Sequence, residues 1–272
     1  MKKVKKVIFN FTQKFVSFLA KHKFIENHLS VLARQYLYEI RGFSYEFQLN
    51  GELELINKVA DKWSELIFFD VGANVGDYSI EMLKANDKTV LHLFELNSDL
   101  HDGLKQRFQN VNAVINNFGL SNKKELVTYS KFPEMSSVNS IFPISFSHLS
   151  REHGSGHVDL GDDYCIRAEI SRVNFMKIDV EGWERYVLLG FQKMLESKQI
   201  DALTWEYGYS SADSNWVTRD FYAFLSNYGY ECGVVRKKGI DFSPFNYELN
   251  DFTSGPNYFA CLPEHKNYFE LN

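Results

Sequence analysis

The chain has 272 residues, of which 44% are hydrophobic and 24% are charged, so it is long enough to bury one substantial core. Its formal net charge is -5, but residues 1–23 hold seven lysines and no acidic residue, which leaves -12 for the remaining residues. An acidic main part excludes nucleic acid as the expected partner, because that binding depends on neutralising phosphates.

Cysteine content and hydropathy indicate where the protein resides. Cys165, Cys232 and Cys261 are odd in number, widely spaced and contain no C-x-x-C pair. This pattern predicts reduced thiols in a cytoplasmic protein. No apolar stretch approaches the length of a membrane span.

The N-terminal stretch predicts an amphipathic helix with one apolar face. It begins like a secretory signal, yet Asn10, Gln13 and Lys14 interrupt the apolar core and no A-x-A cleavage site follows. Two interpretations are open: the helix packs on the domain or on a second subunit of a homodimer, or it lies on the anionic inner face of a membrane. The apolar face comprises Val4, Val7, Ile8, Phe11, Phe15, Phe18 and Leu19.

The chain divides into a helical extension, residues 1–50, and a main domain, residues 51–272. Within the extension, residues 28–40 favour a second helix. The stretch that follows, residues 41–63, leads into the main domain, and we expect it to cap the ligand pocket.

The main domain begins with a strand, a glycine turn and a helix. An apolar run from Leu66 ends in Asp70, the turn carries Gly72 and Gly76, and helical periodicity starts at Tyr78. Gly72 can adopt backbone angles that other residues avoid and can let a ligand lie against the main chain. Gly76 lets the helix approach the strand.

The turn differs from the usual phosphate-binding turns. Asn74 occupies the middle glycine position of a G-x-G-x-x-G dinucleotide fingerprint, and the chain has no G-x-x-x-x-G-K-[ST] loop. The turn instead resembles motif I of class I S-adenosylmethionine (SAM) methyltransferases. The next strand, residues 89–96, carries Glu95, which follows Gly72 at a spacing typical of an acid that holds ribose hydroxyls. A solvated strand end is the alternative for Glu95.

A third strand at residues 111–116 is followed by Asn117 and Phe118. In class I methyltransferases the segment after the third strand borders the adenine of SAM. Asn117 could therefore supply a polar contact and Phe118 an apolar face. Each could equally be an ordinary turn or core residue.

Residues 123–172 are long for one crossover. They predict an added strand at residues 124–132 and a Ser-rich loop at residues 133–157, which we assign to acceptor recognition. His148, His153 and His157 lie near several aspartates but lack a standard zinc spacing. A flexible charged loop is favoured over a metal site, so we expect no metal.

The most specific stretch is residues 172–195. A strand ending in Ile178 delivers Asp179 to the carboxyl edge of the sheet, where α/β domains place ligands. Glu181, Gly182 and Glu184 then open a helix. Helix capping explains Glu184 well but explains Asp179 poorly.

Several motifs in this order resemble those of FkbM-type SAM-dependent methyltransferases. They are F-F-D-V-G-A-N-V-G-D-Y-S, L-F-E-L-N, N-F-G-L-S, D-D-Y-C, F-M-K-I-D-V-E-G-W-E and W-E-Y-G, and the similarity covers residues 51–263. Leu96 stands where proline is frequent in that family, and Gly119 where alanine is frequent.

The resemblance implies an α/β fold of the Rossmann-like, doubly wound class I methyltransferase type, mostly parallel with one antiparallel strand, plus the N-terminal helical extension. Residues 201–209 supply a fifth strand containing Glu206, and two C-terminal stretches supply a terminal antiparallel pair. The residues expected to bind SAM are Asp70, Gly72, Asn74, Gly76, Tyr78, Glu95, Leu96, Asn117, Phe118 and Asp179.

The function implied is O-methylation of a hydroxyl on a glycan, a glycolipid or a related metabolite. Asp179 is the first candidate for the base and Glu206 the second, while Glu181 could orient the acceptor or Lys177. Alternatives are an NAD-dependent sugar oxidoreductase, disfavoured by the missing glycine and the lack of a Y-x-x-x-K pair, and a non-catalytic SAM- or glycan-binding module, disfavoured by the intact acids. N-methylation is weakened by the lack of a D/N-P-P-[YF] sequence.

Overall fold

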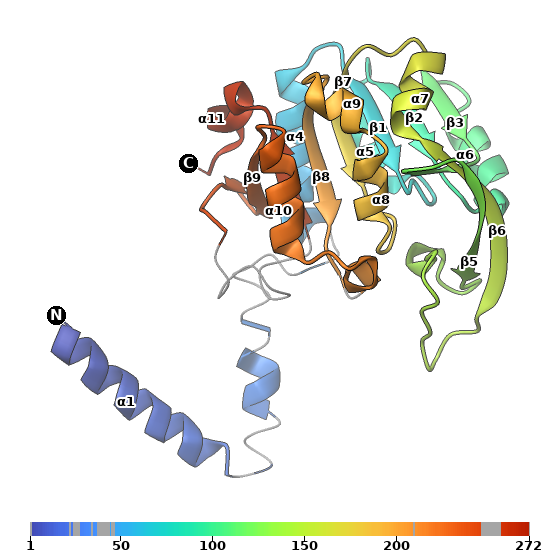
Figure 1. Ribbon diagram of the computed structural model, residues 1–272. Coiled ribbons are helices and arrows are strands. Elements are labelled where there is room, and N and C mark those ends of the chain that lie inside the picture. The colour runs from blue at the N-terminus through green and yellow to red at the C-terminus, as the bar shows by residue number, and fades with distance from the viewer. Residues whose placement is uncertain are drawn as a thin grey trace.

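The computed structural model describes residues 2–21, 23, 28–33, 35–36, 44, 47–208, 210–245 and 257–271. Its centre is an eight-stranded sheet with the strand order β10-β9-β11-β8-β7-β1-β2-β3 (Figure 1). The strands of this sheet are β1 (Ile67–Val71), β2 (Val90–Phe94), β3 (Ala113–Asn116), β7 (Val173–Ile178), β8 (Ile200–Glu206), β9 (Glu231–Arg236), β10 (Gly239–Asp241) and β11 (Asn257–Cys261).

The core of this sheet is parallel: β1 pairs with β2 and β7, β2 with β3, and β7 with β8. β11 runs antiparallel between β8 and β9. This arrangement confirms the predicted doubly wound, mostly parallel fold. It also adds a second antiparallel strand at the edge, because the three-residue β10 pairs antiparallel with β9.

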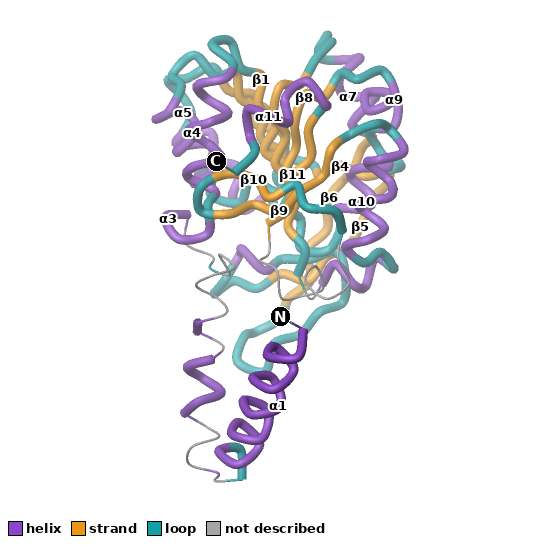
Figure 2. Tube along the Cα trace, turned by 90° about the vertical axis from the view of Figure 1, so that its left-hand side faces the viewer, coloured by secondary structure: helices purple, strands orange, loops and turns teal. Residues whose placement is uncertain are grey.

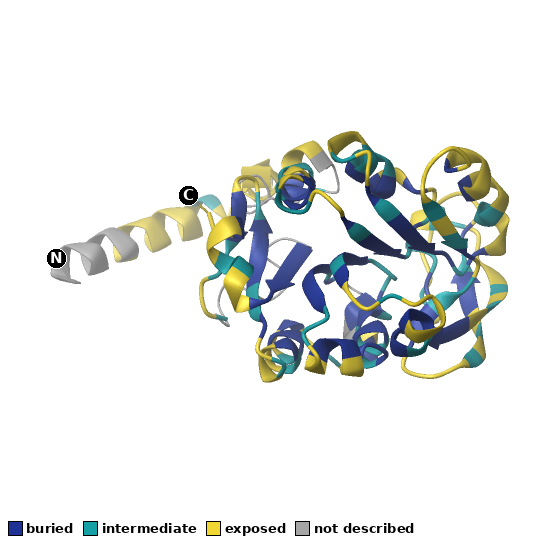
Figure 3. Cartoon of the chain, turned by 90° about the horizontal axis from the view of Figure 1, so that it is seen from above, coloured by how far each residue is buried: buried dark blue, intermediate teal, exposed yellow. Residues whose placement is uncertain are grey.

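Helices cover both faces of the sheet, so the domain has three layers (Figure 3). Successive residues of β1 divide between the two cores: Phe68 packs with α4 and α5, and Phe69 packs with α7 and α8. The helices are α4 (Glu52–Lys62), α5 (Asp77–Ala85), α6 (His101–Arg107), α7 (Gly161–Arg167), α8 (Glu184–Leu189), α9 (Gln192–Glu196), α10 (Thr218–Asn227) and α11 (Lys266–Phe269). Short 3₁₀ turns are η1 (Ser98–Leu100), η2 (Ser136–Val138), η3 (Ser210–Ser214) and η4 (Pro263–His265).

The insertion between β3 and β7 forms a second sheet, with the order β4-β6-β5. β4 is Gly119–Ser121, β5 is Glu125–Lys131 and β6 is Glu152–Leu160. β5 confirms the added strand. The prediction of a loop through residue 157 is wrong at its end, because residues 152–157 belong to β6 and pair with residues 126–131 of β5.

α1 (Lys2–Leu19) lies apart from the three-layer domain (Figures 1 and 2). It is helical as predicted and points away from the sheet in both of these side views. Residues 28–33 and 35–36 are helical, whereas the end of the predicted second helix, residues 37–40, lies outside the described residues. α3 (Phe47–Asn50) leads into α4, and the domain boundary at residue 50 stays a prediction.

Candidate active site

A cavity of about 930 Å³ lies at the carboxyl edge of the parallel strands. Residues that directly follow β1, β2 and β7, together with the last residue of β8, line it. This is the edge where open α/β sheets bind ligands, because the loops there diverge from the strand ends.

The turn after β1 is held in a tight conformation. Gly72 has φ +83°, and a β-carbon there would overlap the carbonyl oxygen of Asp179. The amides of Gly72 and Ala73 both donate to the carbonyl of Phe94 at 3.0 Å. Glycine at residue 72 therefore serves the close approach of the β7 end as well as the backbone angle predicted for it, while its contact with a ligand stays a prediction. A β-carbon at Gly76 would overlap the Phe108 ring.

Asn74 and Glu95 connect the ends of β1 and β2. Asn74 has φ +48°, an uncommon angle for a non-glycine residue. The backbone amide of Asn74 donates to Glu95 Oε2 at 2.7 Å, and the backbone amide of Asn97 donates to Glu95 Oε1 at 2.8 Å. Glu95 is only 9% exposed, and burial raises its pKa although the two amides oppose the shift. The backbone thus holds this carboxyl group in one position at the cavity wall.

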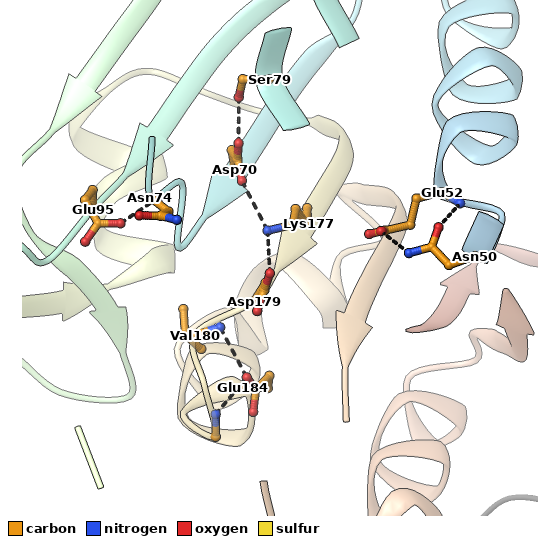
Figure 4. A network of polar contacts seen from close by, with 11 residues as sticks. Asn50, Glu52, Asp70, Asn74, Ser79, Glu95, Lys177, Asp179, Val180 and Glu184 are labelled. Carbon is orange, nitrogen blue, oxygen red and sulfur yellow. Dashed lines mark hydrogen bonds and ion pairs between the residues drawn. The ribbon is translucent and has the colours of Figure 1, made fainter. Parts of the chain in front are cut away.

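Lys177 joins two strand ends through ion pairs (Figure 4). Its Nζ lies 2.9 Å from Asp179 Oδ2 and 3.8 Å from Asp70 Oδ1. Asp70 also accepts a hydrogen bond from Ser79 Oγ at 2.6 Å. Burial opposes the lysine charge, but Asp179 and Asp70 outweigh it and raise the pKa of Lys177. The ammonium therefore stays charged and fixes the Asp179 side chain, which is 32% exposed.

Three further carboxyl groups gather beside Asp179. Burial, together with Asp179 and Glu184, raises the pKa of Glu181 to about 8. Burial, with the negative charges of Asp179 and Glu181, raises the pKa of Glu206 well above its ordinary range, and a hydrogen bond with Asp179 acts in the same direction. Glu184 accepts backbone-amide hydrogen bonds from Val180 and Gly182, so it holds the turn before α8, and α8 has no side-chain cap at its first turn. Glu181 thus favours the protonated form at neutral pH, and the pKa shift of Glu206 is in the same direction.

The structure brings most of the predicted site residues to one cavity. The predicted residues that line it are Gly72, Asn74, Tyr78, Glu95, Leu96, Asp179, Glu181 and Glu206. Among the described residues, four predicted ones lie outside this lining. Asp70 is buried behind Lys177, Gly76 faces Phe108, Asn117 is exposed and Phe118 packs against Phe94 and Tyr164.

The Ser-rich segment of the insertion covers the cavity. Ser136 Oγ donates to Asn74 Oδ1 at 2.7 Å, and Ser140 Oγ donates to the carbonyl of Glu181 at 2.6 Å. These bonds tie one segment to both the β1 turn and the β7 end. The seven lining residues from Met135 to Ile141 all belong to this segment, in keeping with its predicted role near the acceptor.

Asn50 and Glu52 are two of the lining residues that sequence reasoning missed. Asn50 Nδ2 donates to Glu52 Oε2 at 2.5 Å, and the Glu52 amide donates to Asn50 Oδ1 at 2.9 Å. Residues 41–63 were expected to cap the pocket, but no spacing rule singles out the side chains of Asn50 and Glu52. Burial raises the pKa of Glu52 to about 7, with Asn50 and Lys177 opposing the shift.

Protonation of Glu52 predicts a pH-dependent stability. Between pH 4.5 and 7 the folded state keeps a proton that the unfolded chain has lost, so the free energy of unfolding falls as the pH rises. The shift corresponds to about 3 kcal/mol for this group. Urea titrations from pH 4.5 to 8 should show a smaller decline in the Glu52→Gln variant. The exposed Glu65→Gln variant is the control, and an unchanged slope in Glu52→Gln would contradict the assignment.

Two of the three histidines considered for a metal site lie in a strand, and two of the nearby aspartates make contacts within the protein. His153 and His157 lie in β6, while Asp159 pairs with Arg167 at 2.6 Å and Asp162 accepts amide hydrogen bonds from the start of α9. Within the described parts of the chain, no group of three or more His, Cys, Asp or Glu residues is placed to hold a metal ion.

The lining fits SAM, which carries a ribose, a sulfonium and an ammonium group. A buried carboxyl group held by two amides, at Glu95, suits ribose hydroxyls, and the acidic lining around Asp179 suits a cationic ligand. The strand order, the glycine turn after β1 and the acid after β2 define a class I methyltransferase, the class that uses SAM as its methyl donor.

The chain belongs to the family of methyltransferase FkbM domains, whose family model matches residues 70–232. This confirms the resemblance seen in the motifs. A curated relative, the hexuronic acid methyltransferase AglP of Haloferax volcanii, is 27% identical over 155 residues. The match covers 55% of this chain and 60% of AglP, so the chain spans less than two thirds of that relative.

Solved structures of methyltransferases also resemble the chain at low identity. The O-methyltransferase of Bacillus cereus in complex with SAH has a TM-score of 0.42 and 11% identity, with coverage of 90% of this chain and 96% of that chain. The O-methyltransferase TomG of Streptomyces achromogenes has a TM-score of 0.40 and 10% identity, with coverage of 78% and 79%.

Proposed function

We propose that the protein transfers a methyl group from SAM to a hydroxyl of a glycan, a glycolipid or a related metabolite. The observation that carries this proposal is the position of Asp179. It follows β7 directly, lines the same cavity as Glu95 and is held by Lys177 at 2.9 Å. A carboxylate in this place can accept a proton from a hydroxyl bound in the cavity.

SAM supplies an electrophilic methyl group when bound. The residues of this chain position the acceptor and take its proton, since a sugar hydroxyl is a weak nucleophile at neutral pH. Asp179 is the proposed base. Burial raises the pKa of Glu206 well above its ordinary range, and this residue orients Asp179 through their hydrogen bond.

The acceptor class follows from two observations. The name of AglP supports a sugar, and the charge of the lining supports a neutral one. Among the described residues that line the cavity, Lys177 is the one lysine or arginine, and Asp70 and Asp179 already engage it. With that lysine engaged, a uronate carboxylate would have no cationic partner among the described lining residues. We therefore propose a neutral sugar as the acceptor.

The proposed acceptor predicts a preference in a matched panel. We expect methyl transfer from labelled SAM to neutral glycosides to exceed transfer to the corresponding uronosides by about tenfold or more, because burying an unpaired carboxylate is costly. Methyl esters of the same uronosides are the control, since they remove the charge and keep the shape. Faster transfer to the free uronosides than to their esters would contradict the neutral acceptor.

The activity itself is tested by two measurements on the purified protein. Mass spectrometry should detect SAM or its demethylated product bound to the protein, and calorimetry should show binding of SAM at micromolar concentrations but no binding of NAD. Labelled-methyl transfer to host polysaccharide fractions then identifies the acceptor. Binding of NAD in place of SAM would favour the oxidoreductase alternative.

A further inference from the structure

α1 presents an apolar face to solvent. Phe11 and Phe15 are 71% and 55% exposed, and they lie one helical turn apart on the same face. Large aromatic side chains exposed on neighbouring turns are unusual in a soluble helix, and they mark a surface that another apolar phase covers.

The charge of the same segment is entirely positive. Residues 1–23 contain seven lysines and no acid, whereas the remaining residues carry a net charge of -12. On a helical wheel of the sequence, Lys2, Lys3, Lys6 and Lys14 lie outside the arc from Val7 to Leu19, which holds seven of the apolar residues, Val4, Val7, Ile8, Phe11, Phe15, Phe18 and Leu19. An apolar stripe flanked by lysines complements a surface that offers both hydrocarbon and negative charge.

We propose that α1 docks the protein on an anionic lipid bilayer. The helix lies in the plane of the interface, with Phe11 and Phe15 at the boundary of the acyl chains and the lysines among the headgroups. Among the described helices, none is long and apolar enough to cross a membrane. The docking is peripheral, and it goes beyond the proposed function because it requires no methyl transfer.

A second copy of the chain is a weaker occupant. Two α1 helices packed together would bring two segments of seven lysines against each other, with no acid in either to compensate. On the described domain the exposed large hydrophobic residues belong to different elements, such as Leu126 in β5 and Ile166 in α7, so the domain offers no matching stripe.

The test is co-sedimentation of the full chain with vesicles of phosphatidylcholine alone or mixed with phosphatidylglycerol. We expect binding to the anionic vesicles that weakens as salt screens the lysines. The double variants Phe11→Glu/Phe15→Glu and Lys14→Glu/Lys21→Glu should each bind at least about tenfold more weakly. Ile166→Glu, which places the same charge on an exposed apolar residue of the domain, should bind as the unchanged protein does.

Light scattering on the same proteins gives their oligomeric state, which distinguishes docking on a bilayer from packing of α1 against a second copy of the chain. No binding of the unchanged chain to anionic vesicles, or equal binding by Phe11→Glu/Phe15→Glu, overturns the proposal. A dimer that becomes a monomer in that variant, without vesicle binding, also overturns it and makes α1 a subunit interface. SAM affinity, measured by calorimetry without lipid, should be unchanged in all variants, so failure of docking is distinguishable from failure of the proposed function.

Discussion

Replacing Asp179 with asparagine should leave SAM binding intact and lower turnover by about 100-fold or more. Asparagine keeps the shape of the side chain and an oxygen that can face Lys177 Nζ, now 2.9 Å from Asp179 Oδ2. It removes the group proposed to accept the proton of the acceptor hydroxyl. Single-turnover rates measured at saturating SAM and acceptor, beside SAM titration calorimetry, would separate chemistry from binding.

Asp213→Asn is the matched control for this result. Asp213 lines the same cavity but is exposed, so its substitution should leave turnover unchanged. If Asp179→Asn loses SAM affinity in proportion to its activity, Asp179 is a cofactor ligand. The base would then be sought at Glu206, whose carboxyl group is hydrogen-bonded to Asp179.

A second large effect is expected when Glu95 becomes alanine. If Glu95 holds two ribose hydroxyls as predicted, loss of these charge-assisted hydrogen bonds costs about 1.5–3 kcal/mol, so SAM affinity should fall by about 10- to 100-fold. The same change leaves the backbone amides of Asn74 and Asn97 without their acceptor, so the midpoint temperature of thermal unfolding should also fall.

Two comparisons distinguish the ribose role from a purely structural one. Glu95→Gln keeps an acceptor oxygen for one amide and should lose less affinity than Glu95→Ala. Glu65→Ala removes an exposed carboxyl group and should change neither affinity nor stability. Unchanged SAM affinity in Glu95→Ala, measured by calorimetry at a temperature where the variant is folded, would refute the ribose role.

Local patterns were sufficient for most of the fold and for part of the site. The run ending at Asp70, the turn from Gly72 and the strand before Asp179 were predicted within a few residues of their observed bounds. Their signals are short-range, because periodicity and glycine placement depend on neighbours in the chain. The same reasoning ended a loop too late at residue 157, since β6 forms by pairing with β5 and its own sequence is rich in glycine and histidine.

Local sequence patterns did not predict which side chains line the cavity. Asn117 and Phe118 follow β3 in the expected order, yet one is exposed and the other packs against Phe94 and Tyr164. Sequence order places a segment at the sheet edge, but the direction of each side chain depends on the packing around it. Asn50 and Glu52 enter the lining from a helix pair that precedes β1, a contact that no spacing rule contains.

By itself, the sequence determined the alternation of strands and helices, the acids at the carboxyl edge and the basic amphipathic character of the first helix. Each of these follows from residues close together in the chain. Only the tertiary structure decided that Ser136 reaches Asn74, that Lys177 joins Asp70 to Asp179, and that Glu181 and Glu206 hold raised pKa values. Those properties depend on burial and on charges brought together from distant segments, and neither is encoded in any single stretch.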